Sequence, residues 1–188
     1  AIKLRDCSNQ EVPAVAGTVG TVQIDNAGPT VAVVAPNGGE TWYVGSSQDI
    51  IWTASDPAGL ASVDLAYTTD GTNYTPIVTG LPGTDVSYSW TIPAAASATV
   101  LVQVTAHDNL GNSASDASDA DFTIAYHVIT ATAGAGGSID PSGAVNVVHG
   151  EDQSFTITPN EHYHVSALLV DGVPQSLEPQ PTGYTFPE

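Results

Sequence analysis

Short runs of alternating apolar and polar residues, separated by turn-forming residues, recur along most of this 188-residue chain. A clear example runs from Val63 to Tyr67 and leads to the hairpin signal Asp70-Gly71, after which residues 74–78 form the returning run. Alternation places every second side chain on the same face of a strand, so these runs predict half-buried β-strands and not helices. The 18 glycines and 13 prolines supply the turns between them. We therefore predict an all-β fold.

The region between Pro29 and Ile124 contains seven such runs. The predicted strands cover residues 30–34, 48–53, 63–67, 74–78, 87–92, 100–106 and 121–124. This number of short strands in such a length is typical of an immunoglobulin-like β-sandwich, which we place at residues 29–125. Trp52 and Trp90 lie in alternating runs, so we predict that both are core residues.

Two motifs in this region support the assignment. The first is Pro36-Asn37-Gly38-Gly39-Glu40-Thr41-Trp42, and the second runs from Tyr88 to Pro93 with the sequence YSWTIP. Together they make the region similar to bacterial immunoglobulin-like surface repeats. The resemblance implies a structural repeat, and such repeats share no single activity.

The sequence after Ile124 has a different pattern, which begins with HVITATAGAGGSIDPSG at residues 127–143. With the continuation through FTITP at 155–159 and LVDGV at 169–173, it resembles the B-repeat of internalin-type bacterial surface proteins. The resemblance implies a small β-rich domain over residues 126–188. The family pattern continues into another strand after Phe186, so the module is expected to be one strand short.

Residues 1–28 resemble the last two strands of a preceding immunoglobulin-like repeat and are predicted to form a β-hairpin. An isolated hairpin is marginally stable in water, which leaves two alternatives. Either the chain is a segment of a longer repeat protein, or it exchanges strands with identical subunits through open sheet edges. Neighbouring repeats or identical subunits are therefore the expected partners.

The charge of the chain excludes several functions. It has 20 acidic residues, and its only two cations, Lys3 and Arg5, lie at the start. Nucleic-acid binding by a basic face and docking on anionic membranes both need clustered cations. No apolar run is long enough to span a bilayer. One cysteine, Cys7, allows no internal disulfide. The composition is typical of a secreted bacterial protein, so we predict an extracellular or cell-surface location.

After Arg5, no carboxylate can pair with lysine or arginine in its own chain, and clustered carboxylates must stay solvated, take up protons or bind metal ions. In a sandwich of this kind, the start of the first strand lies at the same end as the loop that contains Asp56 and the turn at residues 108–112. We therefore predict a calcium site from hard oxygen ligands there, a reading that the surface-repeat resemblance supports. The alternative is that these residues only cap turns. The candidate ligands are Asp25, Asp56, Asp108, Asn109 and Asn112.

Other candidate sites are weaker. His162 and His164 have the spacing of two metal ligands on one side of a strand, with His149 as a conceivable third, but we favour a surface pair. His107 and His127 are interpreted as having no special role. Asp116, Asp119 and Asp121 are interpreted as a solvated acidic face.

The sequence contains no catalytic motif, so we predict that the chain is not an enzyme. The preferred function is a non-catalytic structural or interaction module of a secreted surface protein, such as a stalk, adhesin or filament subunit. The alternative is a carbohydrate-binding or anchoring accessory module of a secreted hydrolase. That alternative would rely on sugar stacking, mainly by Trp42 or exposed tyrosines, with surface glycans as partners.

Overall fold

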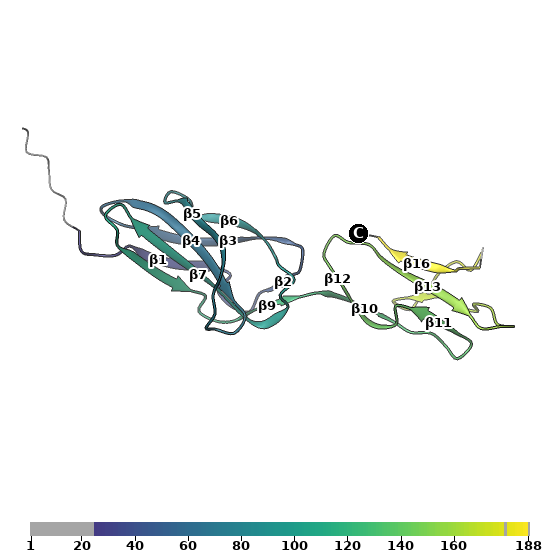
Figure 1. Ribbon diagram of the computed structural model, residues 1–188. Coiled ribbons are helices and arrows are strands. Elements are labelled where there is room, and N and C mark those ends of the chain that lie inside the picture. Colours follow the sequence, from purple (N-terminus) through teal and green to yellow (C-terminus); the bar gives the residue numbers. More distant parts are fainter. Residues whose placement is uncertain (1–24, 179, 188) are drawn as a thin grey trace, which may run out of the picture.

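A computed structural model describes residues 25–178 and 180–187, and these residues form strands, turns and loops without a helix. Figure 1 shows two groups of strands in a row, joined by a short connection between β9 and β10. We call β1–β9 the sandwich and β10–β16 the C-terminal region. The all-β prediction is confirmed. The hairpin predicted for residues 1–28 lies outside the described residues, apart from residues 25–28. Cys7 lies outside them as well.

The sandwich consists of a three-stranded sheet, in the order β1-β3-β6, facing a six-stranded sheet, in the order β2-β9-β7-β4-β5 with β8 paired to β7. The strands are β1 (Thr30–Ala35), β2 (Thr41–Tyr43), β3 (Ser47–Ser55), β4 (Leu60–Thr68), β5 (Thr75–Pro82), β6 (Ser87–Thr91), β7 (Ser97–Asp108), β8 (Ser113–Ala117) and β9 (Phe122–Ala125). All seven predicted strands are present, and the immunoglobulin-like architecture is confirmed.

Two strands of the sandwich were not predicted. Strand β2 is three residues long and pairs in parallel with β9, with Trp42 opposite Ile124. Strand β8 has the sequence SASDA, which lacks apolar alternation, and it pairs with β7 through backbone hydrogen bonds. Neither strand could be recognised from hydrophobic periodicity, because one is too short and the other is polar.

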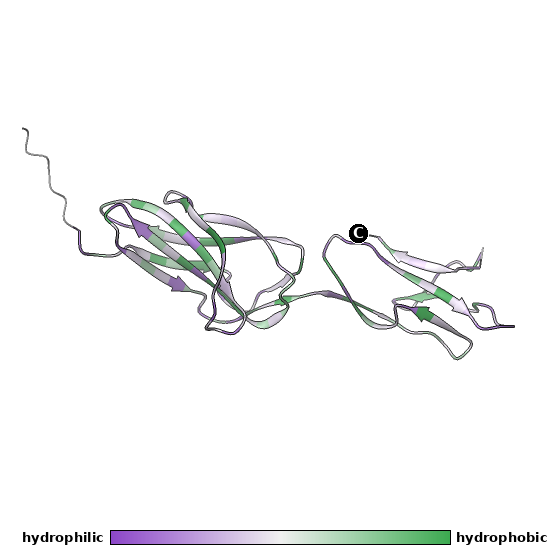
Figure 2. Ribbon diagram, viewed as in Figure 1, coloured by the Kyte–Doolittle hydropathy of each residue, from purple (hydrophilic) through white to green (hydrophobic). Residues whose placement is uncertain are grey.

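The core of the sandwich lies between the two sheets, and its fifteen buried apolar residues come from both. Strand β7 alternates buried and half-buried positions from Val100 to Asp108, and Figure 2 shows hydrophobic residues recurring along the sandwich strands. Trp52 and Trp90 are buried, as predicted. Trp42 is also buried, and its ring contacts those of Trp90 and Phe122 at centroid distances of 6.2 and 5.0 Å. The ring of Trp42 is therefore not exposed for stacking against a sugar.

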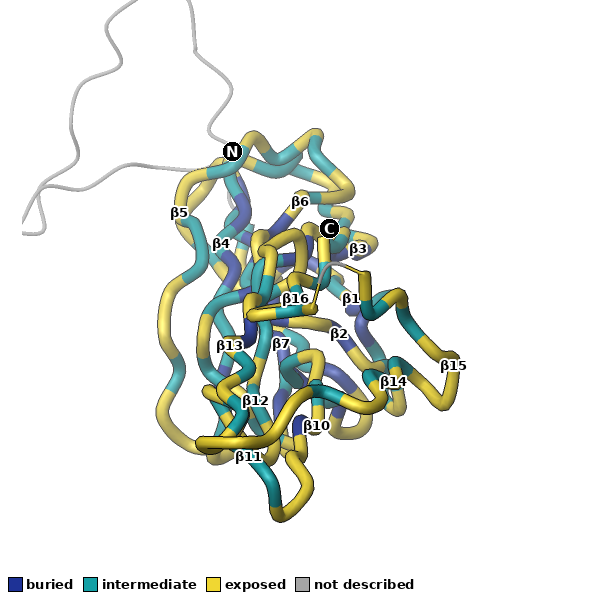
Figure 3. The backbone as a smooth tube through the Cα atoms, turned by 90° about the vertical axis from the view of Figure 1, so that its right-hand side faces the viewer, coloured by how far each residue is buried: buried dark blue, intermediate teal, exposed yellow. Residues whose placement is uncertain are grey.

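The C-terminal region is built from smaller sheets. Strands β10 and β12 pair, β11-β13-β16 form a three-stranded antiparallel sheet, and β14 and β15 form a short hairpin. The bounds are β10 (His127–Ala131), β11 (Gly137–Asp140), β12 (Gly143–Val147), β13 (Gln153–Pro159), β14 (Leu169–Val170), β15 (Val173–Pro174) and β16 (Gly183–Phe186). Only Ala131 and Phe155 are buried apolar residues among the described part of this region, and the end-on view in Figure 3 shows the buried segments mainly in the sandwich.

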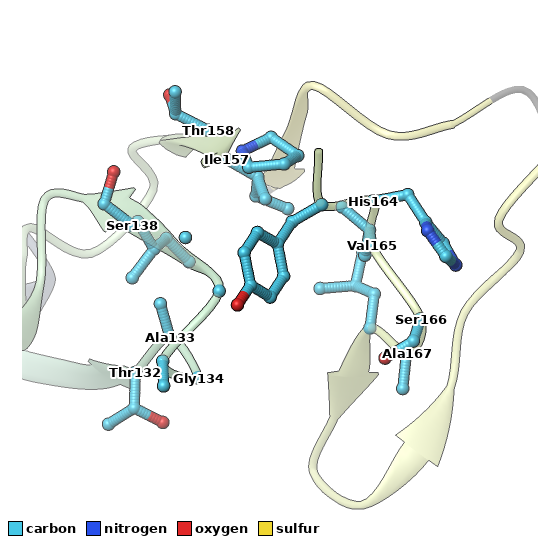
Figure 4. Close-up of a pocket in the computed structure, with 17 residues that line it drawn as sticks. Thr132, Ala133, Gly134, Ser138, Ile157, Thr158, His164, Val165, Ser166 and Ala167 are labelled. Atoms are coloured by element: carbon cyan, nitrogen blue, oxygen red, sulfur yellow. The ribbon is translucent and has the colours of Figure 1, made fainter. Parts of the chain in front are cut away.

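Two adjoining grooves open in the C-terminal region. One has a volume of about 300 Å³ and is lined by apolar side chains that include Ile139, Phe155 and Phe186. The other, shown in Figure 4, has a volume of about 370 Å³ and lies between residues 132–139 and residues 157–168. Ser138, Thr158 and His164 are among the residues that line it. This region is therefore more open than the sandwich.

The two regions meet where the turn after β12 packs on the end of β2. The backbone N–H of His149 donates to the carbonyl of Val44 at 2.8 Å. Gly45 has a φ of +87°, and a Cβ at that position would lie 2.5 Å from Cγ1 of Val148. Glycine is needed there both for the backbone conformation and for the close approach of the two segments. None of the described segments forms a helix long and apolar enough to cross a membrane.

Candidate metal centre

Asp56 begins the loop between β3 and β4. Its Oδ1 accepts a hydrogen bond from the N–H of Ala58 at 2.7 Å, and its carbonyl accepts one from Gly59 at 3.1 Å. This is an Asx turn, a local arrangement that aspartate favours. The other carboxylate oxygen, Oδ2, is buried and has no hydrogen-bond partner. A buried carboxylate oxygen without a partner is costly, so this atom is available for a ligand.

Asp108 ends β7 and is only 3% exposed. Its Oδ1 accepts hydrogen bonds from the N–H groups of Leu110 and Asn112, both at 2.8 Å, and its Oδ2 accepts one from Nδ2 of Asn112 at 2.7 Å. Burial raises the pKa of Asp108, but these hydrogen bonds outweigh it, and the pKa lies below its usual value. The loop thus keeps a buried carboxylate ionised.

The two loops are joined by Asn109. Its backbone N–H donates to the carbonyl of Gly59 at 3.1 Å, and its Nδ2 donates to the carbonyl of Ala58 at 3.1 Å. Gly59 has a φ of +86°, and a Cβ there would lie 2.8 Å from Nδ2 of Asn109. These contacts fix the position of the Asp56 loop relative to the Asp108 loop before any ion is bound.

Asp25 reaches the same place from the segment that precedes β1. Its Oδ1 accepts a hydrogen bond from the N–H of Ala27 at 2.9 Å. A Cβ on Gly28 would lie 3.0 Å from the carbonyl oxygen of Ser113, so this segment passes close to the start of β8. The Asp25 carboxylate is therefore presented to the loops by a turn and a close backbone crossing.

The structure brings three of the five candidate ligands together. One carboxylate oxygen from each of Asp25, Asp56 and Asp108 lies within 4.8 Å of the other two. The described residues contain no lysine or arginine, so no side chain of those types offsets the repulsion among the three carboxylates. Ca²⁺ takes six to eight oxygen ligands, and a cluster of carboxylates near backbone carbonyls and water suits that requirement. The donor set therefore fits calcium.

The two asparagines have a role that the sequence analysis did not predict. The amide of Asn109 donates to Ala58, and the amide of Asn112 donates to Asp108. Both side chains thus hold the loops together through their N–H groups. The prediction that these residues supply oxygen ligands to calcium stays a prediction.

The acidic residues at the end of the sandwich also serve the backbone. Oδ2 of Asp116 accepts a hydrogen bond from the N–H of Val33 at 2.7 Å and so links β8 to β1 across the two sheets. Asp119 and Asn37 exchange two hydrogen bonds, each of 2.8 Å. Asp119 and Asp121 are exposed, as the interpretation of a solvated face expects, whereas Asp116 is half-buried and has a structural contact distant in sequence.

The histidines are arranged differently from the prediction. His162 and His164 do not lie on a strand, and His162 occupies a turn with a φ of +70°. His149 instead faces His127, with Nε2 of His127 and Nδ1 of His149 at 3.4 Å. The sequence analysis missed this pair, because His127 and His149 are 22 residues apart and come together through the pairing of β10 with β12, in which His127 lies opposite Val147.

No protein-family model matches this chain, and no curated protein matches it. A solved structure of the fibronectin(III)-like modules of CbhA from Clostridium thermocellum is similar to it, with 16% sequence identity and a TM-score of 0.39. The similarity covers 85% of this chain and 79% of the other. The fold assignment rests on the sheets described above, and the resemblance of the C-terminal region to the internalin-type B-repeat stays an expectation.

Proposed function

We propose that this chain is a non-catalytic structural and interaction module of a secreted bacterial surface protein, in which calcium rigidifies one end of the sandwich. The observation that carries the proposal is the convergence of Asp25, Asp56 and Asp108, with an unpartnered buried oxygen on Asp56. An extracellular location suits this role, because millimolar calcium is available there to sites of modest affinity.

Calcium would act on the segment that leads into the sandwich. Asp56 and Asp108 belong to loops anchored on the core strands β3, β4 and β7, whereas Asp25 belongs to the segment before β1. An ion shared by all three would tie the incoming chain to the rigid body of the sandwich. The expected consequence is a fixed angle between this domain and whatever precedes it, which is useful in a stalk, adhesin or filament.

The proposed partners are neighbouring β-domains or identical subunits that contact the chain through strand edges. Strand β16 is at the edge of its sheet, and its residues Tyr184 and Phe186 line the apolar groove. A strand from a neighbour that pairs with this edge would also cover apolar surface. Light scattering over a range of concentrations tests whether identical subunits associate. A chain that stays monomeric at every concentration would contradict that part of the proposal.

The calcium proposal is tested by the variant Asp56→Asn. Asparagine keeps an oxygen for the bond from Ala58 and replaces the unpartnered oxygen with an N–H₂ group that can donate to the neighbouring carboxylates. Without calcium, we expect this variant to melt above the wild type, because one negative charge leaves the cluster. With calcium, we expect the wild type to gain stability by about 2.7 kcal/mol at 100 times its Kd, and the variant to gain little.

Asp49→Asn is the matched control. Asp49 is exposed on β3, the strand that leads to Asp56, so the substitution removes the same charge but outside the cluster. Its calcium response, followed by calorimetric melting with chelator and with millimolar calcium, should equal that of the wild type. A wild-type melting temperature that calcium leaves unchanged would contradict the site, and so would an equal gain in Asp56→Asn.

A further inference from the structure

Two imidazole rings face each other at the junction between the sandwich and the C-terminal region. His127 is the first residue of β10, and His149 lies in the turn that follows β12. Nε2 of His127 and Nδ1 of His149 are 3.4 Å apart, and the ring centroids are 5.6 Å apart. Both residues are exposed, so their nitrogens are accessible from solvent.

Contacts with the sandwich hold the ring of His127 and the backbone of His149. The ring of His127 stacks on that of Tyr43, with a centroid distance of 4.0 Å and an angle of 11° between the planes. The backbone of His149 is held by its hydrogen bond to Val44 and by the close approach of residues 148 and 149 to Gly45. The pairing of β10 with β12, in which His127 lies opposite Val147, and these contacts with the sandwich position the pair, and this preorganisation lowers the cost of binding a ligand.

The separation of the two nitrogens suits a metal ion. Two neutral imidazole nitrogens that face each other can share one proton as a hydrogen bond, and a metal ion can take the place of that proton when both present lone pairs. Zn–N bonds of about 2.0–2.1 Å at a tetrahedral angle put the two nitrogens about 3.4 Å apart. The observed 3.4 Å matches this value, and the exposed rings leave room for water at the remaining positions.

We propose that His127 and His149 form a two-imidazole site for a divalent transition-metal ion, with Zn²⁺ as the reference ion, which braces the β10–β12 pair where it contacts the sandwich. Imidazole nitrogen binds zinc, copper and nickel well, and it is not a calcium ligand. The formal charge of −18 also raises the local concentration of cations around the chain. This site differs from the proposed calcium site in its ligands, its ion and its position in the fold.

The other histidines of the chain do not offer the same geometry. His107 contacts Oδ2 of Asp64 at 3.0 Å, and His162 contacts Glu161 at 3.3 Å. His164 lines the groove shown in Figure 4, away from the junction. These residues therefore provide controls for nonspecific binding by exposed imidazole.

Calorimetric titration with Zn²⁺ in the presence of saturating Ca²⁺ tests the proposal on the full chain. His127→Phe keeps a ring to stack on Tyr43 but removes the nitrogens, and His149→Gln keeps a polar side chain in the turn. Loss of an outer-shell partner already weakens metal binding about 10–100-fold, so loss of a ligand should weaken it at least tenfold. His164→Gln should bind Zn²⁺ as the wild type does. Equal affinity in all four proteins would overturn the proposal.

A second measurement separates this site from the calcium proposal and from a folding defect. Asp56→Asn should retain the zinc affinity of the wild type, and a large loss in that variant would assign the zinc to the acidic cluster and overturn the His127–His149 site. Zinc should also slow hydrogen exchange at the amide of His149, whose N–H bonds to Val44. Zinc binding without slower exchange there would contradict the proposed bracing of this contact with the sandwich. Spectra of the Cu²⁺ complex should show two nitrogen ligands, and a single nitrogen would exclude the pair.

Discussion

The sandwich and the C-terminal region are built from similar strand-and-turn sequences, yet they reach different degrees of closure. The sandwich surrounds a cluster of fifteen buried apolar residues. In the described part of the C-terminal region only Ala131 and Phe155 are comparably buried, while Val128, Tyr163, Leu169 and Val173 are 58–63% exposed. The difference lies in the layers: a six-stranded sheet covers a three-stranded one in the sandwich, whereas the two- and three-stranded sheets of the C-terminal region leave grooves between them.

This comparison shows that alternation in the sequence does not by itself create a core. Strand β13 alternates as well as β6 does, but the sheet that contains it has no broad partner across the layer. Apolar side chains on one face of a sheet need a second layer to cover them. We therefore expect the sandwich to be the more stable unit and the C-terminal region to depend on its neighbours.

The largest expected effect on unfolding free energy comes from truncating one buried phenylalanine in each region. Phe122→Ala in the sandwich removes a ring that is 1% exposed and should cost about 3–5 kcal/mol of unfolding free energy. Phe155→Ala removes a ring that borders the apolar groove and should cost about 2 kcal/mol. Tryptophan fluorescence follows the sandwich alone, since all three tryptophans lie there, and hydrogen exchange follows the C-terminal region. Equal losses would erase the proposed difference.

A smaller effect is expected where the two regions meet. Gly45→Ala adds a Cβ at a φ of +87° and 2.5 Å from Val148, so it should cost about 1–3 kcal/mol and loosen the docking of residues 148 and 149. Gly80→Ala is the control, since its φ is +72° but nothing lies within 4 Å of the added carbon. We expect only Gly45→Ala to speed hydrogen exchange at the His149 amide. Matching exchange in the two variants would show that the C-terminal region does not depend on this contact.

The smallest effect concerns acid stability in the sandwich. Hydrogen bonds from Asn73 and from the Thr72 and Thr68 groups hold the pKa of Asp70 well below its usual range. Because the folded-state pKa is lower than that of the unfolded chain, Asp70 stabilises the fold above about pH 4, and this contribution is lost as the pH falls. Asp70→Asn should therefore lower the melting temperature slightly at pH 7, and its difference from the wild type should shrink as the pH falls from about 4 toward about 2. A constant difference across this range would contradict the assignment.

Most strands of the sandwich could be predicted because, in both sheets, one face of each strand packs on the core and the other face does not. Trp52 and Trp90 follow the alternation that the packing of two layers imposes, and the structure buries both. Strands β2 and β8 were missed, since pairing of β2 with β9 and of β8 with β7 depends on the backbone and leaves no periodic signal. The polar role of Asp116 was missed for the same reason, because its partner Val33 is 83 residues away in sequence.

The candidate site could be predicted only as far as topology dictates it. The start of β1 and the loops after β3 and β7 lie at one end of such a sandwich, which is why Asp25, Asp56 and Asp108 were grouped. Asn109 and Asn112 donate hydrogen bonds within the loops through their side-chain amides. This role depends on rotamers and loop packing, which the sequence pattern does not reveal. Likewise, the meeting of His127 and His149 depends on the pairing of β10 with β12, whose register the sequence pattern does not reveal.

The parallel pairing of β2 with β9 has a mechanical consequence. Tension along the chain would pull on β1, which precedes β2, in one direction and on the connection after β9 in the other. The N–H of Gly39 donates to the carbonyl of Asp121, that of Thr123 to Glu40 and that of Val44 to Ala125, all at 2.9 Å. Force directed along two parallel strands loads such bonds together, in shear, and does not open them one at a time. A pulled chain would thus meet its resistance at this short pair of strands, beside the very segment on which the C-terminal region docks.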